Sequence, residues 1–129
     1  MQSILGNTRK KDITFRRDGQ INISSRVASA LGLENGDVID VLRDRMEYYL
    51  YVKIKAPTVG KHEASCFRSK KNCNFFRAWS KKLCSAMIEA SGVSDPNLKK
   101  IDLSVGEPTS LENIGSVVPI IYKHVLNHD

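Results

Sequence analysis

The stretch DGQINISSRVASALGLENGDVIDVL, residues 18–42, constrains the fold of this chain more than any other part of it. Its first two residues, Asp18 and Gly19, form a hairpin-type turn dipeptide. On either side, residues 13–15 and 21–23 alternate apolar and polar side chains, which is the pattern of strands with one buried face. The sequence therefore predicts a short antiparallel strand pair at this point.

A short helix is predicted directly after the second strand. Ser24 or Ser25 can cap the free N–H groups of a helix over residues 26–31. Gly32 suits the left-handed conformation just past a helix end, and Leu33 can fold back as its apolar partner. A helix of barely two turns is not stable alone, so strands around it have to hold it in place.

Two further strands are predicted over residues 38–42 and 49–54, separated by the polar corner at residues 43–45. Four short strands and one short helix cannot enclose a dry core by themselves. Either a partner chain or the second half of this chain must therefore complete the core.

The order of these signals resembles the AbrB/MazE/SpoVT-like swapped-hairpin family of DNA-binding proteins. The match consists of I-x-I-S followed by R-V-x-x-A-L-G-L-x-x-G-D-x-I-D-V. The resemblance implies that two chains interleave their hairpins into one dimeric barrel that binds duplex DNA. The best-matching residues are Gly19, Ile23, Ala30, Leu31, Gly32, Leu33, Gly36, Asp37 and Val41.

The match is closer to the family's scaffold than to its DNA-contacting surface. Ser24 stands where the family usually has proline, and Ala28 and Ser29 stand where it often has basic residues. Basic side chains on the first strand, the helix start and the N-terminal arm can still contact phosphates or groove edges. The predicted DNA-binding residues are Arg9, Lys10, Lys11, Arg16, Arg17 and Arg26.

Charge and composition agree with an anionic partner. The chain carries a formal charge of +6, and the excess divides evenly, with ten Lys/Arg against seven Asp/Glu in residues 1–57 and again in residues 58–129. Clustered cations favour nucleic acid over a membrane surface. The chain has no long apolar run and has three cysteines, an odd number, so we expect a soluble, cytoplasmic protein without a disulfide framework.

The second half follows a breaker-rich linker at residues 56–60 and resembles no family. A strand is expected near residues 62–67, and a helix from Asn72 or Asn74 to Ala90. Strands are expected over residues 101–105 and 117–125, with Pro119 marking an edge position, and residues 106–115 are expected to be a loop. The predicted fold is α+β and rich in strands, with an N-terminal swapped-hairpin dimeric barrel (1–57) followed by a small β-α-β-β module (58–129).

Metal and catalytic chemistry find little support in the sequence. The spacing H-x3-C-x6-C-x10-C from His62 through Cys66, Cys73 and Cys84 contains no close ligand pair, so structural thiols are expected. No phosphate loop, paired catalytic carboxylates or Ser–His arrangement is recognisable. We expect neither an enzyme nor a cofactor.

Three aromatic residues, Phe75, Phe76 and Trp79, lie beside the basic runs RSKK and KK. Such interleaving is typical of stacking platforms for single-stranded nucleic acid. Phe76 and Trp79 also fit the buried stripe of the expected helix, and core packing is the interpretation we favour for them. The direction of Phe75 stays open, and Lys81 and Lys82 are expected on the solvated side.

Three functions are compatible with the sequence, of which a small enzyme is the least favoured. The first is a homodimeric DNA-binding transcriptional regulator, with a protein partner for the C-terminal module. The alternative is a dimeric interaction or scaffold protein that keeps the barrel without binding DNA.

Overall fold

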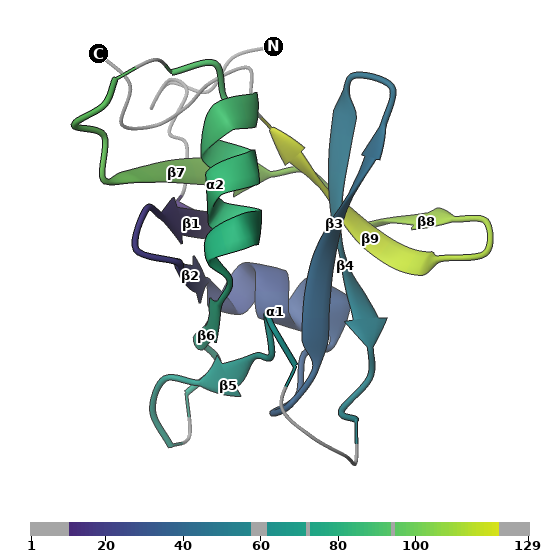
Figure 1. Ribbon diagram of the computed structural model, residues 1–129. Helices are drawn as coiled ribbons and strands as arrows, with labels where there is room; N and C mark the ends of the chain where they lie inside the picture. The colour runs from purple at the N-terminus through teal and green to yellow at the C-terminus, as the bar shows by residue number, and fades with distance from the viewer. Residues whose placement is uncertain (1–10, 58–61, 72, 94, 122–129) are drawn as a thin grey trace, which may run out of the picture.

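The computed structural model describes residues 11–57, 62–71, 73–93 and 95–121, and this part of the chain holds nine strands and two helices (Figure 1). The helices are α1 (Ser25–Leu31) and α2 (Lys81–Ala90). The strands are β1 (Ile13–Arg16), β2 (Gln20–Ile23), β3 (Val38–Asp44), β4 (Glu47–Ile54), β5 (Phe67–Arg68), β6 (Phe76–Trp79), β7 (Lys100–Val105), β8 (Thr109–Leu111) and β9 (Gly115–Ile121). The strand-rich α+β class predicted from the sequence is confirmed.

The elements of the first half are those that local sequence signals predicted. The β1–β2 turn contains Gly19 at a φ of 103°, and Ser24 caps α1. Gly32 ends α1 in the left-handed conformation, with φ 63° and ψ 41°. Leu33 folds back and donates its N–H to the carbonyl of Ala28 at 2.9 Å.

The second helix begins later than expected. It starts at Lys81, where the Ser80 hydroxyl accepts a hydrogen bond from the N–H of Leu83 at 3.0 Å. The predicted start at Asn72 or Asn74 is therefore wrong, although α2 does end at Ala90.

Residues 76–79 form strand β6 in place of the expected first turns of that helix. They pair with β2 in the register Gln20↔Trp79 to Ile23↔Phe76. Phe76 and Ala78 point into the core, whereas Arg77 and Trp79 face outward. Pairing with a strand more than fifty residues earlier in the chain overrides the helical periodicity of this segment.

Three further expectations about strands are wrong. Residues 106–115 were expected to be a loop, but Thr109–Leu111 form β8 beside β9. Residues 62–67 were expected to form a strand, but β5 begins only at Phe67. Pro119 was expected at an edge, yet β9 has β4 on one side and β7 and β8 on the other. The Pro119 carbonyl accepts from Gly106 at 2.8 Å, so its missing N–H faces the point where β9 changes neighbours from β8 to β7. Residues 122–125 of the expected last strand lie outside the described residues.

The strands follow the antiparallel order β3-β4-β9-β7-β1-β2-β6-β5, with β8 added beside β9, and curl into a half-barrel. Residues 64–66 join the two ends of this path. On one side the Ile39 N–H donates to Ala64 at 3.1 Å and the Cys66 N–H donates to Asp37 at 2.7 Å. On the other side the Ala64 N–H donates to the Trp79 carbonyl of β6 at 2.9 Å.

The chain contains the same arrangement twice. The order β1–β2–α1–β3–β4, here the first repeat, recurs as β5–β6–α2–β7–β9, the second repeat, with β8 inserted. Pairings within one repeat have counterparts in the other, β1·β2 matching β5·β6 and β3·β4 matching β7·β9. Between the repeats, β1 of the first pairs with β7 of the second. The equivalent contact in the other direction is the pairing of residues 64–66, just before β5, with β3. The remaining pairings, β2·β6 and β4·β9, join corresponding strands.

One core is shared by both repeats. The same buried cluster holds Phe15 and Ile21 of the first repeat and Phe76, Cys84 and Leu103 of the second. The sequence allowed either a partner chain or the second half of this chain to complete the core. In the structure, the second half of the chain completes it. The domain boundary at residue 57 stays a prediction.

Candidate nucleic-acid interface

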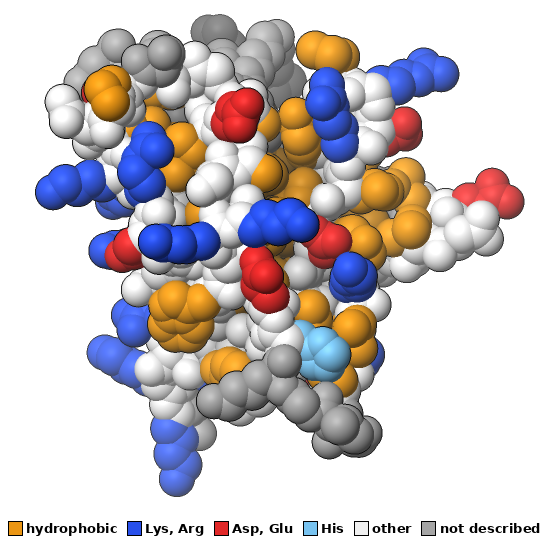
Figure 2. All heavy atoms as spheres, viewed as in Figure 1, with side chains coloured by type: hydrophobic (Ala, Val, Ile, Leu, Met, Phe, Trp, Pro, Cys, Tyr) orange, Lys and Arg blue, Asp and Glu red, His pale blue; other side chains and the backbone are white. Residues whose placement is uncertain are grey.

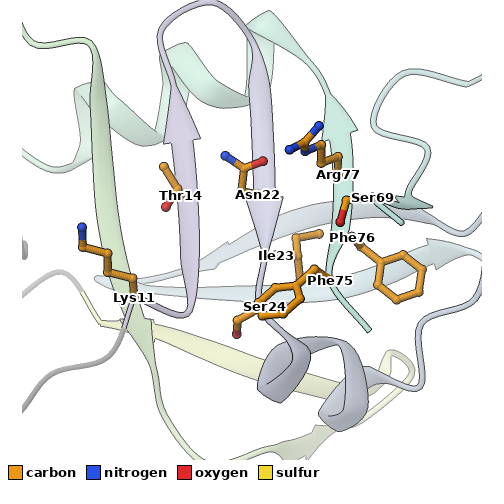
Figure 3. A pocket seen from close by; sticks show the side chains of 9 residues that line it. All are labelled: Lys11, Thr14, Asn22, Ile23, Ser24, Ser69, Phe75, Phe76 and Arg77. Atoms are coloured by element: carbon orange, nitrogen blue, oxygen red, sulfur yellow. The ribbon is translucent and has the colours of Figure 1, made fainter. Parts of the chain in front are cut away.

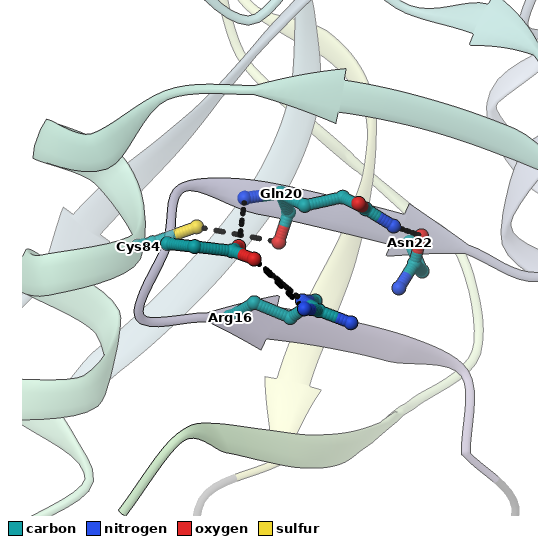
Figure 4. Close-up of polar contacts among 5 residues, drawn as sticks. Arg16, Gln20, Asn22 and Cys84 are labelled. Carbon is teal, nitrogen blue, oxygen red and sulfur yellow. Dashed lines mark hydrogen bonds and ion pairs between the residues drawn. The ribbon is translucent and has the colours of Figure 1, made fainter.

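Two of the predicted DNA-binding cations, one just before β1 and one at its end, form ion pairs. The guanidinium of Arg16 lies 2.8 Å from the carboxylate of Asp18 (Figure 4). This contact raises the pKa of Arg16 and lowers the pKa of Asp18. Lys11 lies 3.7 Å from the buried carboxylate of Asp102.

Arg17 and Arg26 are also engaged with oxygen atoms of the chain. Arg17 donates to the carbonyl of Leu98 at 2.6 Å. Arg26 lies 2.9 Å from Asp12, whose side chain is 2% exposed. Arg9 and Lys10 fall outside the described residues, so a DNA-binding role for all six cations stays a prediction.

A second basic surface surrounds the β5–β6 hairpin. Residues 64–88 contain six Lys/Arg and no Asp or Glu. We define the β5–β6 surface as the exposed side chains on this hairpin and its loop: Phe67, Arg68, Lys70, Lys71, Phe75, Arg77 and Trp79.

The cations of the β5–β6 surface lack a carboxylate partner within the part of the chain that the structure describes. Arg68, Lys70, Lys71 and Arg77 form no ion pair with any residue that the structure describes. Arg68 lies over the ring of Phe76, 5.2 Å from its centroid. These charges are therefore available to an external anion, in contrast to those of Arg16 and Arg26.

Three large aromatic side chains are exposed on the same surface. Trp79 and Phe75 are each 53% exposed and Phe67 is 49% exposed. Core packing was expected for Phe76 and Trp79; it is confirmed for Phe76, at 1% exposed, and is wrong for Trp79, because Trp79 lies on the outward face of a strand. Figure 2 shows blue and orange side chains, without red ones, at the lower left over β5 and β6.

A cleft of about 250 Å³ lies on the outer face of the sheet (Figure 3). Thr14, Asn22 and Arg77 stand side by side across β1, β2 and β6 on its floor. Lys11 and Phe75 line it on other sides. A second hollow, of about 700 Å³ and lined by Arg68, Lys70 and Lys71 among others, shares Ser69 with the cleft. Neither is lined by a carboxylate.

The cysteines lie in unlike surroundings. Burial raises the pKa of Cys66 to about 12 and that of Cys84 to about 11. The Ser69 hydroxyl and neighbouring backbone groups lower the pKa of Cys73. The expectation of buried structural thiols is therefore confirmed for Cys66 and Cys84. Among the described residues no three His, Cys, Asp or Glu side chains lie together in a way that could hold a metal ion.

Two sequence signals would have pointed to this surface. One is the run without Asp or Glu at residues 64–88. Counting charged residues over each half of the chain hides this run. The other is the alternation of Phe75, Arg77 and Trp79 with Phe76 and Ala78, which marks a strand with aromatic residues on its outer face.

No protein-family model, curated protein or solved structure matches the chain significantly. Neither α1 nor α2, the helices of the described residues, is long and apolar enough to cross a membrane.

Proposed function

We propose that the protein binds nucleic acid through the β5–β6 surface. The observation that carries this proposal is the combination of four cations without carboxylate partners and three exposed aromatic side chains on one hairpin. Cations of this kind bind phosphates and release counterions. Exposed aromatic rings provide apolar area that a base can cover.

The finer architecture belongs to the same proposal. In the swapped-hairpin arrangement, two copies of a β-β-α-β-β unit interleave into one barrel. The matching pairings of the two repeats support a single-chain form of that barrel, in which the second repeat takes the place of the partner chain. The shared core then removes the physical reason for the homodimer expected from the sequence, and light scattering should report one chain per particle. A particle of two chains would restore the homodimer.

Regulation of transcription and binding to duplex DNA remain proposals that come from the family resemblance. The resemblance of residues 11–55 favours them, whereas the four of its six cations that the structure describes contact the chain's own oxygens. We therefore assign the main phosphate contacts to Arg68, Lys70, Lys71 and Arg77.

A salt titration of binding tests the proposed function. Full-length protein is added to fluorescently labelled single-stranded and duplex oligonucleotides of mixed sequence, and anisotropy is followed. With four phosphate contacts, affinity for a single strand should fall about 50-fold between about 50 and about 200 mM salt. If neither form binds at the lower salt concentration, the alternative of a non-binding scaffold protein replaces this proposal.

A further inference from the structure

The aromatic side chains of the β5–β6 surface are arranged in a pattern with regular spacing. Phe75, Arg77 and Trp79 alternate along the chain and point outward, whereas Phe76 and Ala78 between them are buried. Phe67 lies directly opposite Arg77 on β5 and so shares its face. Successive outward residues of a strand are about 6.8 Å apart, which leaves room for a planar group between neighbouring side chains.

The strands beside these rings carry side chains that can form hydrogen bonds. Asn22 lies opposite Arg77, and Thr14 lies opposite Asn22. Gln20 lies opposite Trp79 and donates to Asn22 at 2.8 Å. These amide and hydroxyl side chains provide donors and acceptors for base edges. Figure 3 shows Thr14 and Asn22 on the strands next to Arg77.

On the assumption that the proposed function holds, we infer that the ligand is a single-stranded nucleic acid lying along β6. Its bases stack on Phe75, Trp79 and Phe67, and its phosphates bind Arg77 and the cations of residues 68–71. Base faces are accessible in a single strand and hidden in a duplex, where they stack on one another. A duplex bound to the same surface would leave three aromatic rings without a stacking partner.

The carboxylates near Trp79 set one limit of the bound strand. Asp18 and Glu63 line the shallow depression beside this ring. Asp18 is paired with Arg16, and Glu63 accepts a hydrogen bond from the Ser80 hydroxyl. Phosphates are therefore expected on the Arg77 and residue 68–71 side of Trp79, where neither cleft nor hollow has a carboxylate in its lining.

The single tryptophan of the chain is a direct probe of this arrangement. Full-length protein is titrated with oligo(dT), with oligo(U) and with a duplex, each of about twelve nucleotides, and Trp79 fluorescence is recorded. Stacking should quench the fluorescence with both single strands and not with duplex.

Aromatic variants supply the second measurement. Phe75→Ala and Trp79→Ala should each weaken single-strand binding about ten-fold by anisotropy, with Trp79→Phe recovering most of the loss. Met46→Ala removes an even more exposed apolar side chain from the far β3–β4 hairpin and should leave binding unchanged. Duplex binding without quenching, or aromatic variants that bind as wild type does, would overturn the inference and leave the proposed function standing. Absence of binding to every oligonucleotide would overturn both.

Discussion

The two repeats carry their cations in different surroundings. Each half of the chain holds ten Lys/Arg and seven Asp/Glu, so each has a formal charge of 10 − 7 = +3. In the first repeat, Lys11, Arg16 and Arg26 each lie within 4 Å of a carboxylate. In the second, Lys100 lies 3.7 Å from Asp102, whereas a run without acids leaves the cations from Arg68 to Arg77 without a carboxylate among the described residues. Net charge is therefore the same in the two halves, and pairing geometry is what distinguishes their surfaces.

The connections between the first two strands of each repeat differ in the same way. β1 and β2 are joined by a tight turn in which the Gly19 N–H donates to Arg16 at 3.0 Å. β5 and β6 are joined by residues 69–75, which carry Lys70, Lys71 and Phe75. Loops on a rigid scaffold are where binding residues concentrate. The longer connection of the second repeat fits that role.

The largest expected effect comes from removing charge in one repeat and then in the other. The variant Arg68→Gln/Lys70→Gln/Lys71→Gln should lose affinity for nucleic acid about 100-fold at about 50 mM salt, because three phosphate contacts and their counterion release disappear. Lys11→Gln/Arg16→Gln/Arg17→Gln is the matched control and should change affinity less than about three-fold, since these cations already contact the chain's own oxygens.

Anisotropy at two salt concentrations separates the two variants. The first should also show a shallower salt dependence, by about 0.7 of slope for each lost contact. The reverse result, with loss only in the Lys11, Arg16 and Arg17 variant, would move the interface to the first repeat, as the family resemblance predicts.

The next effect concerns stability. Asp12 is 2% exposed and accepts hydrogen bonds from Arg26 at 2.9 Å and from the Val105 N–H at 3.0 Å. Asp12→Asn should lower the free energy of unfolding by about 2 kcal/mol, because a charge-assisted pair is lost in a buried position.

Urea denaturation measures this change, with Asp40→Asn as the control. Asp40 is partly exposed and its nearest cation, Lys53, lies 3.9 Å away, so a change below about 0.5 kcal/mol is expected. Equal losses in the two variants would mean that the Asp12 pair is no stronger than a surface contact. Nucleic-acid affinity should be unchanged in both.

Much of the first repeat could be predicted from its sequence because its signals are local. The Ser24 cap, the left-handed Gly32 and the returning Leu33 all act within a few residues of one another. The prediction for the second repeat was wrong where a long-range contact decides the structure. Phe76, Leu83 and Met87 have helical spacing, but β6 is stabilised by pairing with β2, which no local window contains.

The error in the second repeat also hid the candidate site. A helix through residue 79 would bury Trp79 with Phe76, and the stacking platform was set aside for that reason. As a strand, the same residues divide between two faces, with Trp79 outside and Phe76 inside. Recognising the site therefore required the correct element type for residues 76–79, whereas the basic residues around it can be read from the sequence directly.

A smaller loss of stability is expected at the β1–β2 turn. Gly19 has a φ of +103°, and a Cβ there would lie 2.9 Å from Cγ and 3.2 Å from the backbone N of Lys81. Gly19→Ala should therefore cost about 1–2 kcal/mol in thermal or urea unfolding. Lys71→Ala in the corresponding connection of the second repeat should leave stability unchanged. If Gly19→Ala is also neutral, the turn and the start of α2 can shift apart without cost.

The smallest effect should come from unpairing a cation of the first repeat. Asp18→Asn removes the carboxylate that holds Arg16 but keeps an oxygen for the hydrogen bond from the Gln20 N–H at 3.0 Å. Both side chains are exposed, so the melting temperature should not change.

Because Arg16 lowers the pKa of Asp18, the wild-type pair persists at neutral pH and is lost only as pH falls through that lowered pKa. At pH 7 the variant should therefore bind a single strand about two-fold more tightly at low salt, with no gain at about 200 mM, because a freed guanidinium adds at most one screened phosphate contact. Asp44→Asn, in the far β3–β4 hairpin, is the control, because it makes the same change of charge away from the β5–β6 surface. A gain of ten-fold or more would show that Asp18 restrains a strong site, and the contrast between paired and unpaired repeats would then reflect inhibition by Asp18 rather than loss of function in the first repeat.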